Sequence, residues 1–239
     1  MTKAQTSTPT GGGAQPAKLG RPRASAITSQ DDPREEILRV SAQLFTSSGY
    51  RQTSTLQIAN AVGLRQASLF YYFPRKEDIL TELLDRTVRT QLSFADGLST
   101  LQEGPDVQLY LLIYSDVRTL SSPPGNLGWL MYQPEARTPR FANFQKKYAR
   151  LRGIYESLIS AGEEQGLFTV VNVELTARIV CGLVDGVATW YDAPLRKSSR
   201  EELWVAVTDH AMRGILTRPA RLAKIRATAE AIRARLDPT

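Results

Sequence analysis

Residues 53–78 read TSTLQIANAVGLRQASLFYYFPRKED, and this stretch decides the fold of the N-terminal part of the chain. Ser54 followed three residues later by Gln57 is a capping box, which predicts a short helix that ends before Gly63. A second short helix follows over residues 65–73 and is closed by a proline. Two short helices joined through a tight glycine turn are typical of a helix-turn-helix.

The second short helix is predicted to divide its side chains between two faces. Apolar residues that pack it down on the first helix are Leu64, Leu69, Phe70 and Phe73. The side chains left to face outward are Arg65, Gln66, Ser68, Tyr71 and Tyr72. These types hydrogen-bond to base edges or phosphates, so the pattern favours a helix that reads DNA.

Helical spacing continues on both sides of this motif. Asp32 and Glu35 form a second capping box that opens a helix over residues 33–48, and Lys76 opens a longer helix that continues to about Gly97. Further helices are predicted near residues 106–121, 126–136, 140–162, 173–192, 200–217 and 218–236. Because no convincing strand alternation is present, the sequence predicts an all-α fold: a three-helix head joined by a long helix to a larger helical body.

The 239-residue chain has an ordinary globular composition, with 42% apolar and 23% charged residues. Its one cysteine, Cys181, excludes a disulfide framework within the chain, and one cysteine with one histidine, His210, cannot supply the ligands of a zinc site. The longest apolar run, residues 109–114, is far shorter than a membrane span, and the N-terminus lacks a signal peptide's apolar stretch. We therefore expect a cytoplasmic protein with no metal, cofactor or membrane partner.

The net charge of +6 is unevenly distributed along the chain. Residues 1–90 hold 12 basic and 8 acidic side chains, residues 91–212 hold 11 and 14, and residues 213–239 hold 7 and 2. Basic ends beside an acidic middle suggest a polyanionic partner at the ends. Residues 1–30 contain no acidic residue and are predicted to be a disordered basic arm, which is either an inert tail or a segment whose residues 20–23 enter a DNA groove.

The motif of residues 53–78 resembles the N-terminal signature of the tetracycline-repressor (TetR) family of bacterial transcription regulators. The resemblance covers the helix lengths, the glycine turn, the aromatic cluster and the closing Phe-x-x-Lys-Glu, whereas the body matches only in being helical. The family's phosphate and backbone contacts fall on Thr53, Ser54, Tyr71, Tyr72 and Lys76. Its variable base-reading positions fall on Arg65, Gln66 and Ser68. Phe70 stands where the family usually has tyrosine, so we interpret Phe70 as a core residue.

Four segments follow from these patterns. Residues 1–30 are the arm, 31–75 the DNA-binding head, 76–217 an effector-binding and dimerisation body, and 218–239 a basic amphipathic helix expected to dock on its own body. The body is rich in aromatic residues that suit a planar or hydrophobic small molecule or, alternatively, a plain core: Phe94, Tyr110, Tyr114, Trp129, Tyr132, Phe144 and Tyr148.

A dimer surface is expected on the last pair of body helices, where the resemblance also implies a four-helix interface. The residues predicted to line it are Leu183, Val187, Trp190, Leu203 and Val207, within apolar rows that also include Leu175 and Ile179. Gly182 and Gly186 would allow close approach of a partner helix. Ordinary packing within one chain is the alternative for each of these residues.

The sequence as a whole predicts a dimeric, sequence-specific DNA-binding regulator. By resemblance it acts as a repressor that a small effector releases from a palindromic operator. One alternative is a non-specific architectural helix-turn-helix protein, and another is a ligand-binding protein whose head has lost DNA affinity. An enzyme is not supported, because the single His210 has no Glu-x-x-His partner and no phosphate loop or nucleophile elbow is present.

Overall fold

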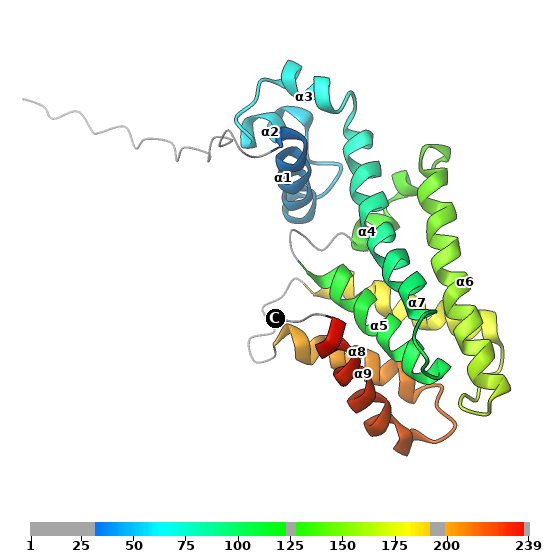
Figure 1. Ribbon diagram of the computed structural model, residues 1–239. Helices are drawn as coiled ribbons and strands as arrows, with labels where there is room; N and C mark the ends of the chain where they lie inside the picture. Colours follow the sequence, from blue (N-terminus) through cyan, green and yellow to red (C-terminus); the bar gives the residue numbers. More distant parts are fainter. Residues whose placement is uncertain (1–31, 123–127, 192–198, 237–239) are drawn as a thin grey trace, which may run out of the picture.

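The computed structural model describes residues 32–122, 128–191 and 199–236, and it is all-α in these ranges apart from an isolated bridge between Phe168 and Leu216 (Figure 1). The head consists of α1 (Pro33–Ser48), α2 (Thr55–Ala61) and α3 (Gln66–Tyr72). The body consists of α4 (Lys76–Leu98), α5 (Pro105–Ser121), α6 (Ala142–Glu164), α7 (Val173–Trp190), α8 (Arg200–Arg213) and α9 (Leu222–Leu236). The head lies at one end of α4, as predicted, whereas the predicted arm of residues 1–30 lies outside the described residues.

The head is attached to α4 by a buried apolar core and by charged side chains at its edge. The Asp32 carboxylate accepts a hydrogen bond from the Arg34 amide at 2.9 Å and caps α1. Arg86 of α4 then donates to Glu35 of α1 at 2.6 Å and to Glu82 of its own helix at 2.9 Å. These contacts fix the direction in which α4 leaves the head.

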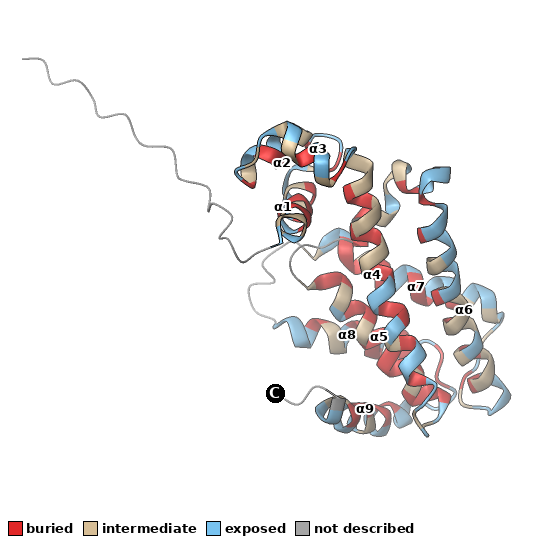
Figure 2. Cartoon of the chain, turned by 45° about the horizontal axis from the view of Figure 1, so that its top comes forward, coloured by how far each residue is buried: buried red, intermediate tan, exposed pale blue. Residues whose placement is uncertain are grey.

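The body is built around α5, which packs against α4, α6, α7, α8 and α9. Every residue of the apolar run 109–114 is buried, and Figure 2 shows buried residues concentrated on α4 and α5. The run that is too short for a membrane span is therefore the centre of the protein core. Within the described residues, no helix combines the length and apolarity that crossing a membrane requires.

The prediction of one continuous helix near residues 126–136 is wrong. The described part of this region consists of three 3-10 turns: η1 (Gly128–Tyr132), η2 (Pro134–Arg137) and η3 (Pro139–Phe141). Pro134 and Pro139 lack the amide donors that a continuous α-helix needs, so each proline starts a new turn. The turns also connect the body to the head, because Arg51 in the α1–α2 loop donates to Glu135 at 2.8 Å and Arg140 pairs with Asp78 near the start of α4.

Helix α9 docks on its own body, as predicted, after the short 3-10 turn η4 (Pro219–Arg221). Its apolar side buries Ile225, Ala229 and Ile232. Arg221 donates to Asp106 of α5 at 2.8 Å, just before α9 begins. At least one basic side chain of this segment thus pairs with a buried aspartate of the body.

Candidate functional site

Helices α2 and α3 form the predicted helix-turn-helix. The Ser54 hydroxyl accepts from the Gln57 amide at 3.2 Å, and the Gln57 side-chain oxygen accepts from the Ser54 amide at 2.7 Å, which completes the capping box. Gly63 has a φ of +73°, a left-handed conformation that favours glycine, and the Leu64 amide then donates to the Ala59 carbonyl at 2.8 Å. The turn directs α3 across α2.

One face of α3 is free of the head's core. Leu69 is fully buried, whereas Arg65 and Tyr71 are exposed, Tyr71 to 84%, and Ser68 is half-buried. The Gln66 amide nitrogen donates to the Thr55 hydroxyl at 2.9 Å, so this side chain ties α3 to α2. The structure therefore brings Arg65, Ser68 and Tyr71 to one outward surface, with Gln66 at its base.

Two residues predicted to contact phosphate are engaged inside the head. Thr53 is 1% exposed, and its hydroxyl donates to the Gly49 carbonyl at 2.8 Å. The Lys76 ammonium donates to the carbonyls of Tyr50 at 2.7 Å and Thr53 at 2.9 Å, and partial burial lowers its pKa. Thr53 and Lys76 thus close the loop between α1 and α2, because that loop leaves carbonyls for which they are the donors, and their contact with phosphate stays a prediction.

The aromatic cluster of α3 also differs from the sequence interpretation. Phe70, expected in the core, is 41% exposed, whereas Tyr72 is half-buried and packs on the core with its ring edge-on to Tyr71 at 5.3 Å. Leu56 of α2 is exposed as well and was missed, although it lies off the face that carries Ile58. Exposed apolar groups on α2 and α3 suit the methyl groups of thymine.

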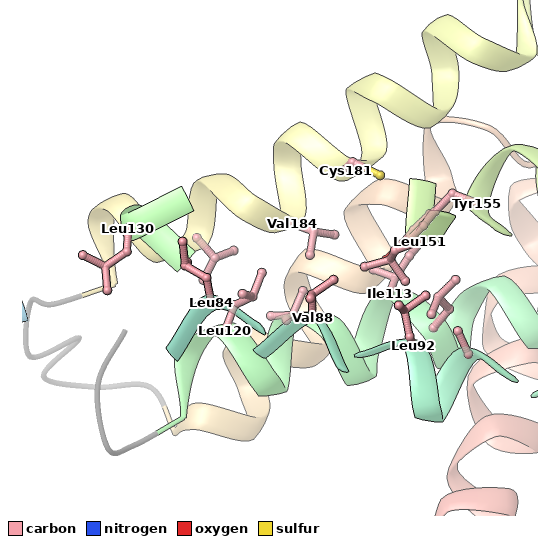
Figure 3. Packing of buried hydrophobic residues seen from close by; sticks show 14 of the residues in the cluster. Leu84, Val88, Leu92, Ile113, Leu120, Leu130, Leu151, Tyr155, Cys181 and Val184 are labelled. Atoms are coloured by element: carbon pink, nitrogen blue, oxygen red, sulfur yellow. The ribbon is translucent and has the colours of Figure 1, made fainter. Parts of the chain in front are cut away.

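A second candidate site lies inside the body, among some of the aromatic residues predicted for an effector pocket, and its two aspartates were not predicted. Asp116 of α5 accepts a hydrogen bond from the Tyr155 hydroxyl of α6 at 2.7 Å. Asp185 of α7 accepts from Tyr148 of α6 and interacts with the Tyr132 hydroxyl of η1. Figure 3 shows the surrounding packing, in which Tyr155 and Cys181 come from α6 and α7 into the core formed with α4 and α5.

Both carboxyl groups of this interior site are hard to ionise. Burial raises the pKa of Asp116 to about 7, and the nearby Asp185 charge adds to the effect. Burial raises the pKa of Asp185 to about 6, against the hydrogen bonds from two tyrosines. One oxygen of Asp116 and the side-chain oxygen of Gln91 on α4 are buried without a hydrogen-bond partner. In the described ranges, no cluster of three or more His, Cys, Asp or Glu side chains is arranged to hold a metal ion.

Known proteins resemble the chain over both parts. Residues 37–83 match the family model described as bacterial regulatory proteins, tetR family, and residues 105–215 match that of a tetracyclin repressor-like C-terminal domain. The solved structure of Mycobacterium smegmatis AmtR is 35% identical, with a TM-score of 0.72, and the match covers 87% of this chain and 98% of that one. The chain belongs to the TetR family.

Two further relatives extend this result. The transcriptional repressor KstR2 of Mycobacterium tuberculosis H37Rv is 24% identical over 163 residues, 66% of this chain and 80% of KstR2. The structure of AibR in complex with isovaleryl coenzyme A and operator DNA has the same fold, with a TM-score of 0.66 and 18% identity over 79% of this chain and 99% of AibR. The TetR-family head is that of a DNA-binding transcription regulator, and the relatives matched here are regulators.

The aromatic residues predicted to line one effector pocket in this TetR-family body fall into two groups. Phe144, Tyr148 and Tyr132 gather near Asp185, and Phe94 of α4 is half-buried against the core. Two others lie elsewhere: Tyr110 donates to Asp209 of α8 at 3.1 Å, and Tyr114 lies under the Arg233 guanidinium of α9 at 3.6 Å. Their spacing along α5 turns Tyr110 and Tyr114 away from Asp116, so they do not line this interior site, and their contact with an effector stays a prediction. The Trp129 side chain lies outside the described part of the structure.

The predicted dimer residues also divide. Leu183 and Trp190 are exposed on α7, next to two further exposed apolar residues, Leu175 and Ile179. In contrast, Val187, Leu203 and Val207 are buried in the protomer's own core and offer almost no surface to a partner. For these three residues the prediction is corrected, because they lie on the sides of α7 and α8 that face the rest of the body.

Proposed function

We propose that the protein is a homodimeric transcription repressor that binds a palindromic operator and leaves it when a small molecule binds inside the body. The observation that carries the proposal is the outward face of α3, where Arg65 and Tyr71 are exposed and Ser68 is half-buried. Arginine and hydroxyl groups in such a position donate to base edges and phosphates. A head that used α3 only for packing would bury this face.

The matched relatives support the repressor, operator and effector parts of the proposal. KstR2 is named a repressor, and AibR is described with both a small molecule, isovaleryl coenzyme A, and operator DNA. In this chain, the interior site of Asp116 and Asp185 lies in the body, apart from the outward face of α3 in the head. DNA and effector would then occupy separate sites, and any effect of one on the other must pass through the protein.

An exposed apolar stripe on α7 supports dimerisation. Leu175, Ile179 and Leu183 follow one another at helical spacing and continue to Trp190, and Ile179 alone is 63% exposed. A Cβ atom added at Gly182 or Gly186 would meet no atom of the chain within 4 Å, so the protomer itself does not require glycine there. A second α7 crossing the stripe would bury these side chains, at about 1.5–3 kcal/mol for each large one, and would use the bare backbone of the glycines.

Two connections could carry the effector's influence to the head. Helix α4 has 23 residues and is about 35 Å long at 1.5 Å per residue, so a small tilt at the body moves the head by several ångströms. Half-sites of a palindrome lie about 34 Å apart, and a dimer with heads at another spacing cannot fill both. The second connection is the Arg51–Glu135 ion pair, which joins the α1–α2 loop to η2, next to η1 and Tyr132.

The test is selection of genomic DNA fragments by the purified protein at physiological salt, followed by sequencing. The expected result is an enriched palindrome whose binding weakens at least tenfold in Arg65→Ala/Gln66→Ala, since each good base contact contributes about 1–3 kcal/mol. Arg150→Ala is the control, because Arg150 pairs with Asp96 on the body surface at 2.7 Å. Salt-sensitive binding with no enriched sequence would favour an architectural protein, and no DNA binding would favour a ligand-binding protein.

Dimerisation is tested in the same preparation by sedimentation. Ile179→Asp places a like charge on both sides of the proposed two-fold axis, so the variant is expected to sediment as a monomer and to lose the palindrome. Arg178→Ala removes the neighbouring exposed arginine, which pairs with Glu174 on the same helix at 2.7 Å, and is expected to remain a dimer. A dimeric Ile179→Asp protein would refute the α7 interface.

A further inference from the structure

Among its described residues, the body has three buried aspartates that accept a hydrogen bond from a tyrosine. Asp209 accepts from Tyr110 and is also paired with Arg226 of α9, with Arg213 at 3.9 Å. The other two pairs are Asp116 with Tyr155 and Asp185 with Tyr148. In the parts of the chain that the structure describes, no lysine or arginine forms an ion pair with Asp116 or Asp185, and no basic group contributes to the pKa of either.

Unpartnered acceptor atoms lie in the same interior site. Asp116 is 1% exposed, and one of its two oxygens has no hydrogen-bond partner. Gln91 of α4, equally buried, leaves its side-chain oxygen without a donor. Asp185 and Cys181 share this environment, because the charges of Asp116 and Asp185 both raise the pKa of the Cys181 thiol. The tyrosine hydroxyls and the Gln91 side chain satisfy part of these acceptors, two oxygens are left without a donor, and no basic group among the described residues lies against either carboxyl.

The walls of the site are aromatic. The rings of Phe144 and Tyr148 stack at 6.1 Å, and Tyr155 is fully buried beside Asp116. Tyr132 is 44% exposed while its hydroxyl interacts with Asp185, so its side chain connects the site to solvent. Aromatic faces attract cations as well as apolar groups, and a group that took the place of the Tyr132 hydroxyl would reach Asp185 from outside.

We propose that Asp116 and Asp185 bind the positively charged nitrogen of a small organic ligand, a primary ammonium or an amidinium attached to an apolar group. The nitrogen would donate to both carboxylates and to the Gln91 oxygen, and the apolar group would lie against Tyr148 and Phe144. This inference deepens the proposed function, on which it rests, by giving the effector a chemical class. The aromatic lining alone suggested a neutral hydrophobic ligand, and the two carboxylates change that expectation.

Proton release follows from this binding mode. In the empty site Asp116, whose pKa is about 7, is about half protonated at pH 7, and Asp185, whose pKa is about 6, is mostly protonated only below that pH. A cation binds their ionised forms, so it must displace these protons. The other titratable groups facing the two carboxyls, Tyr132, Tyr148, Tyr155 and Cys181, have pKa values raised by burial and stay neutral in this range.

The experiment compares matched probes with the full-length protein. The probes are 2-phenylethylammonium, neutral 2-phenylethanol and anionic 3-phenylpropanoate, with ammonium and methylammonium as smaller cations, titrated at pH 8 by calorimetry. We expect at least one cation to bind ten or more times tighter than the neutral and anionic probes. We also expect its affinity to fall at least fivefold between pH 8 and pH 5.5, whereas the affinity of the alcohol stays constant.

Three variants locate the site. Asp116→Asn and Asp185→Asn are expected to reduce the preference for ammonium over alcohol to about onefold. Asp209→Asn is the control, because Asp209 is also a buried partner of a tyrosine but has its own arginine, and it is expected to keep the wild-type preference. Should a variant fail to fold, the pH dependence of the wild-type protein still tests the proposal.

Two results would overturn the inference: no cation preferred over the neutral probe by the wild-type protein, or a preference that persists in both Asp116→Asn and Asp185→Asn. DNA selection is read separately, so the two proposals fail separately. An enriched palindrome without cation preference leaves the repressor proposal standing and removes the ligand class. Cation preference without DNA binding leaves the interior site standing and removes the repressor.

Discussion

On the side of α5 that faces α8 and α9, Tyr110 donates to Asp209, and Arg226 neutralises that carboxylate. On the side that faces α6 and α7, Asp116 accepts from Tyr155 and has no basic neighbour among the described residues. A tyrosine thus donates to a buried aspartate on each side of α5. The aspartate on the first side is also paired with an arginine, and the aspartate on the second side is not. A buried carboxylate that is paired with an arginine stabilises the packing of the helices. A buried carboxylate without a basic partner is either protonated or available to bind a cation.

The difference arises from the C-terminal segment. Three arginines of η4 and α9 contact α5 or α8. Arg221 of η4 donates to Asp106 of α5. In α9, Arg226 pairs with Asp209 of α8, and Arg233 lies over the Tyr114 ring of α5. On the other side, no lysine or arginine among the described residues pairs with Asp116 or Asp185, and the Tyr132 hydroxyl of η1 interacts with Asp185. The side with arginines is therefore expected to be rigid, and the side without them is expected to respond to ligand and to pH.

Removing Arg226 should leave Asp209 without its closest basic partner, and its surroundings would then resemble those of Asp116. In Arg226→Ala, Asp209 is left buried with only Arg213 at 3.9 Å, and breaking a buried ion pair costs about 3–5 kcal/mol. We expect about 3 kcal/mol of lost unfolding free energy in urea at pH 8, the low end, because Arg226 is partly exposed. Arg235→Ala, on the exposed side of the same helix, is the control and should change stability by less than 0.5 kcal/mol. Equal losses in the two variants would show that Asp209 does not depend on Arg226.

A gain in unfolding free energy, instead of a loss, is expected when Asp116 is replaced. Ionising a carboxyl whose pKa is about 7 instead of 3.8 costs up to about 4 kcal/mol, because each tenfold change in proton affinity is worth about 1.4 kcal/mol. Asp116→Asn removes this cost, keeps an acceptor for Tyr155 and adds a donor for the Gln91 oxygen. We expect the ligand-free variant to gain about 2 kcal/mol at pH 8, measured by urea unfolding. A loss of stability would mean that the Asp116 charge is compensated in the folded protein.

Asp185 should contribute a smaller effect that depends on pH. Its pKa of about 6 exceeds the unfolded value of 3.8, so between about pH 4 and pH 6 the folded state binds more protons than the unfolded state. Stability from this group is therefore full at low pH and is lost as pH rises through about 6. We expect Asp185→Asn and wild type to have similar pH slopes below pH 4 and to diverge by up to about 3 kcal/mol above pH 6.5, in urea series from pH 3.5 to 8. Parallel profiles would contradict the raised pKa.

The head was predictable from sequence because its signals are local. The capping box of Ser54, the turn at Gly63 and the exposed Arg65 act within a few residues, and the structure confirms them. The roles of Thr53 and Lys76 were not predictable in the same way. Both side chains satisfy carbonyls of a loop more than three residues away, and such contacts exist only once the helices have packed.

The body was less predictable because its chemistry comes from tertiary contacts. The α7 stripe follows helical spacing and was found, but the same spacing could not show that Val187 faces inward. Asp116 and Asp185 look like ordinary solvated charges in the sequence. One signal was available for Asp116, because Leu112, Ile113 and Leu120, which lie three or four residues from it along α5, are all apolar. An aspartate on such a face is either a functional group or a paired one.

The smallest expected effect concerns the connection between the head and the side of α5 that carries Asp116. Arg51 and Glu135 form an exposed ion pair at 2.8 Å, and such pairs contribute about 0–1 kcal/mol. Arg51→Ala should therefore leave global unfolding unchanged within 0.5 kcal/mol. Because the pair holds the α1–α2 loop against η2, we expect amide hydrogen exchange in residues 49–53 to rise two- to fivefold, measured by mass spectrometry. Arg150→Ala removes an exposed pair within the body and should leave this segment unchanged. Equal exchange in the two variants would leave α4 as the connection through which the interior site acts on the DNA-binding face.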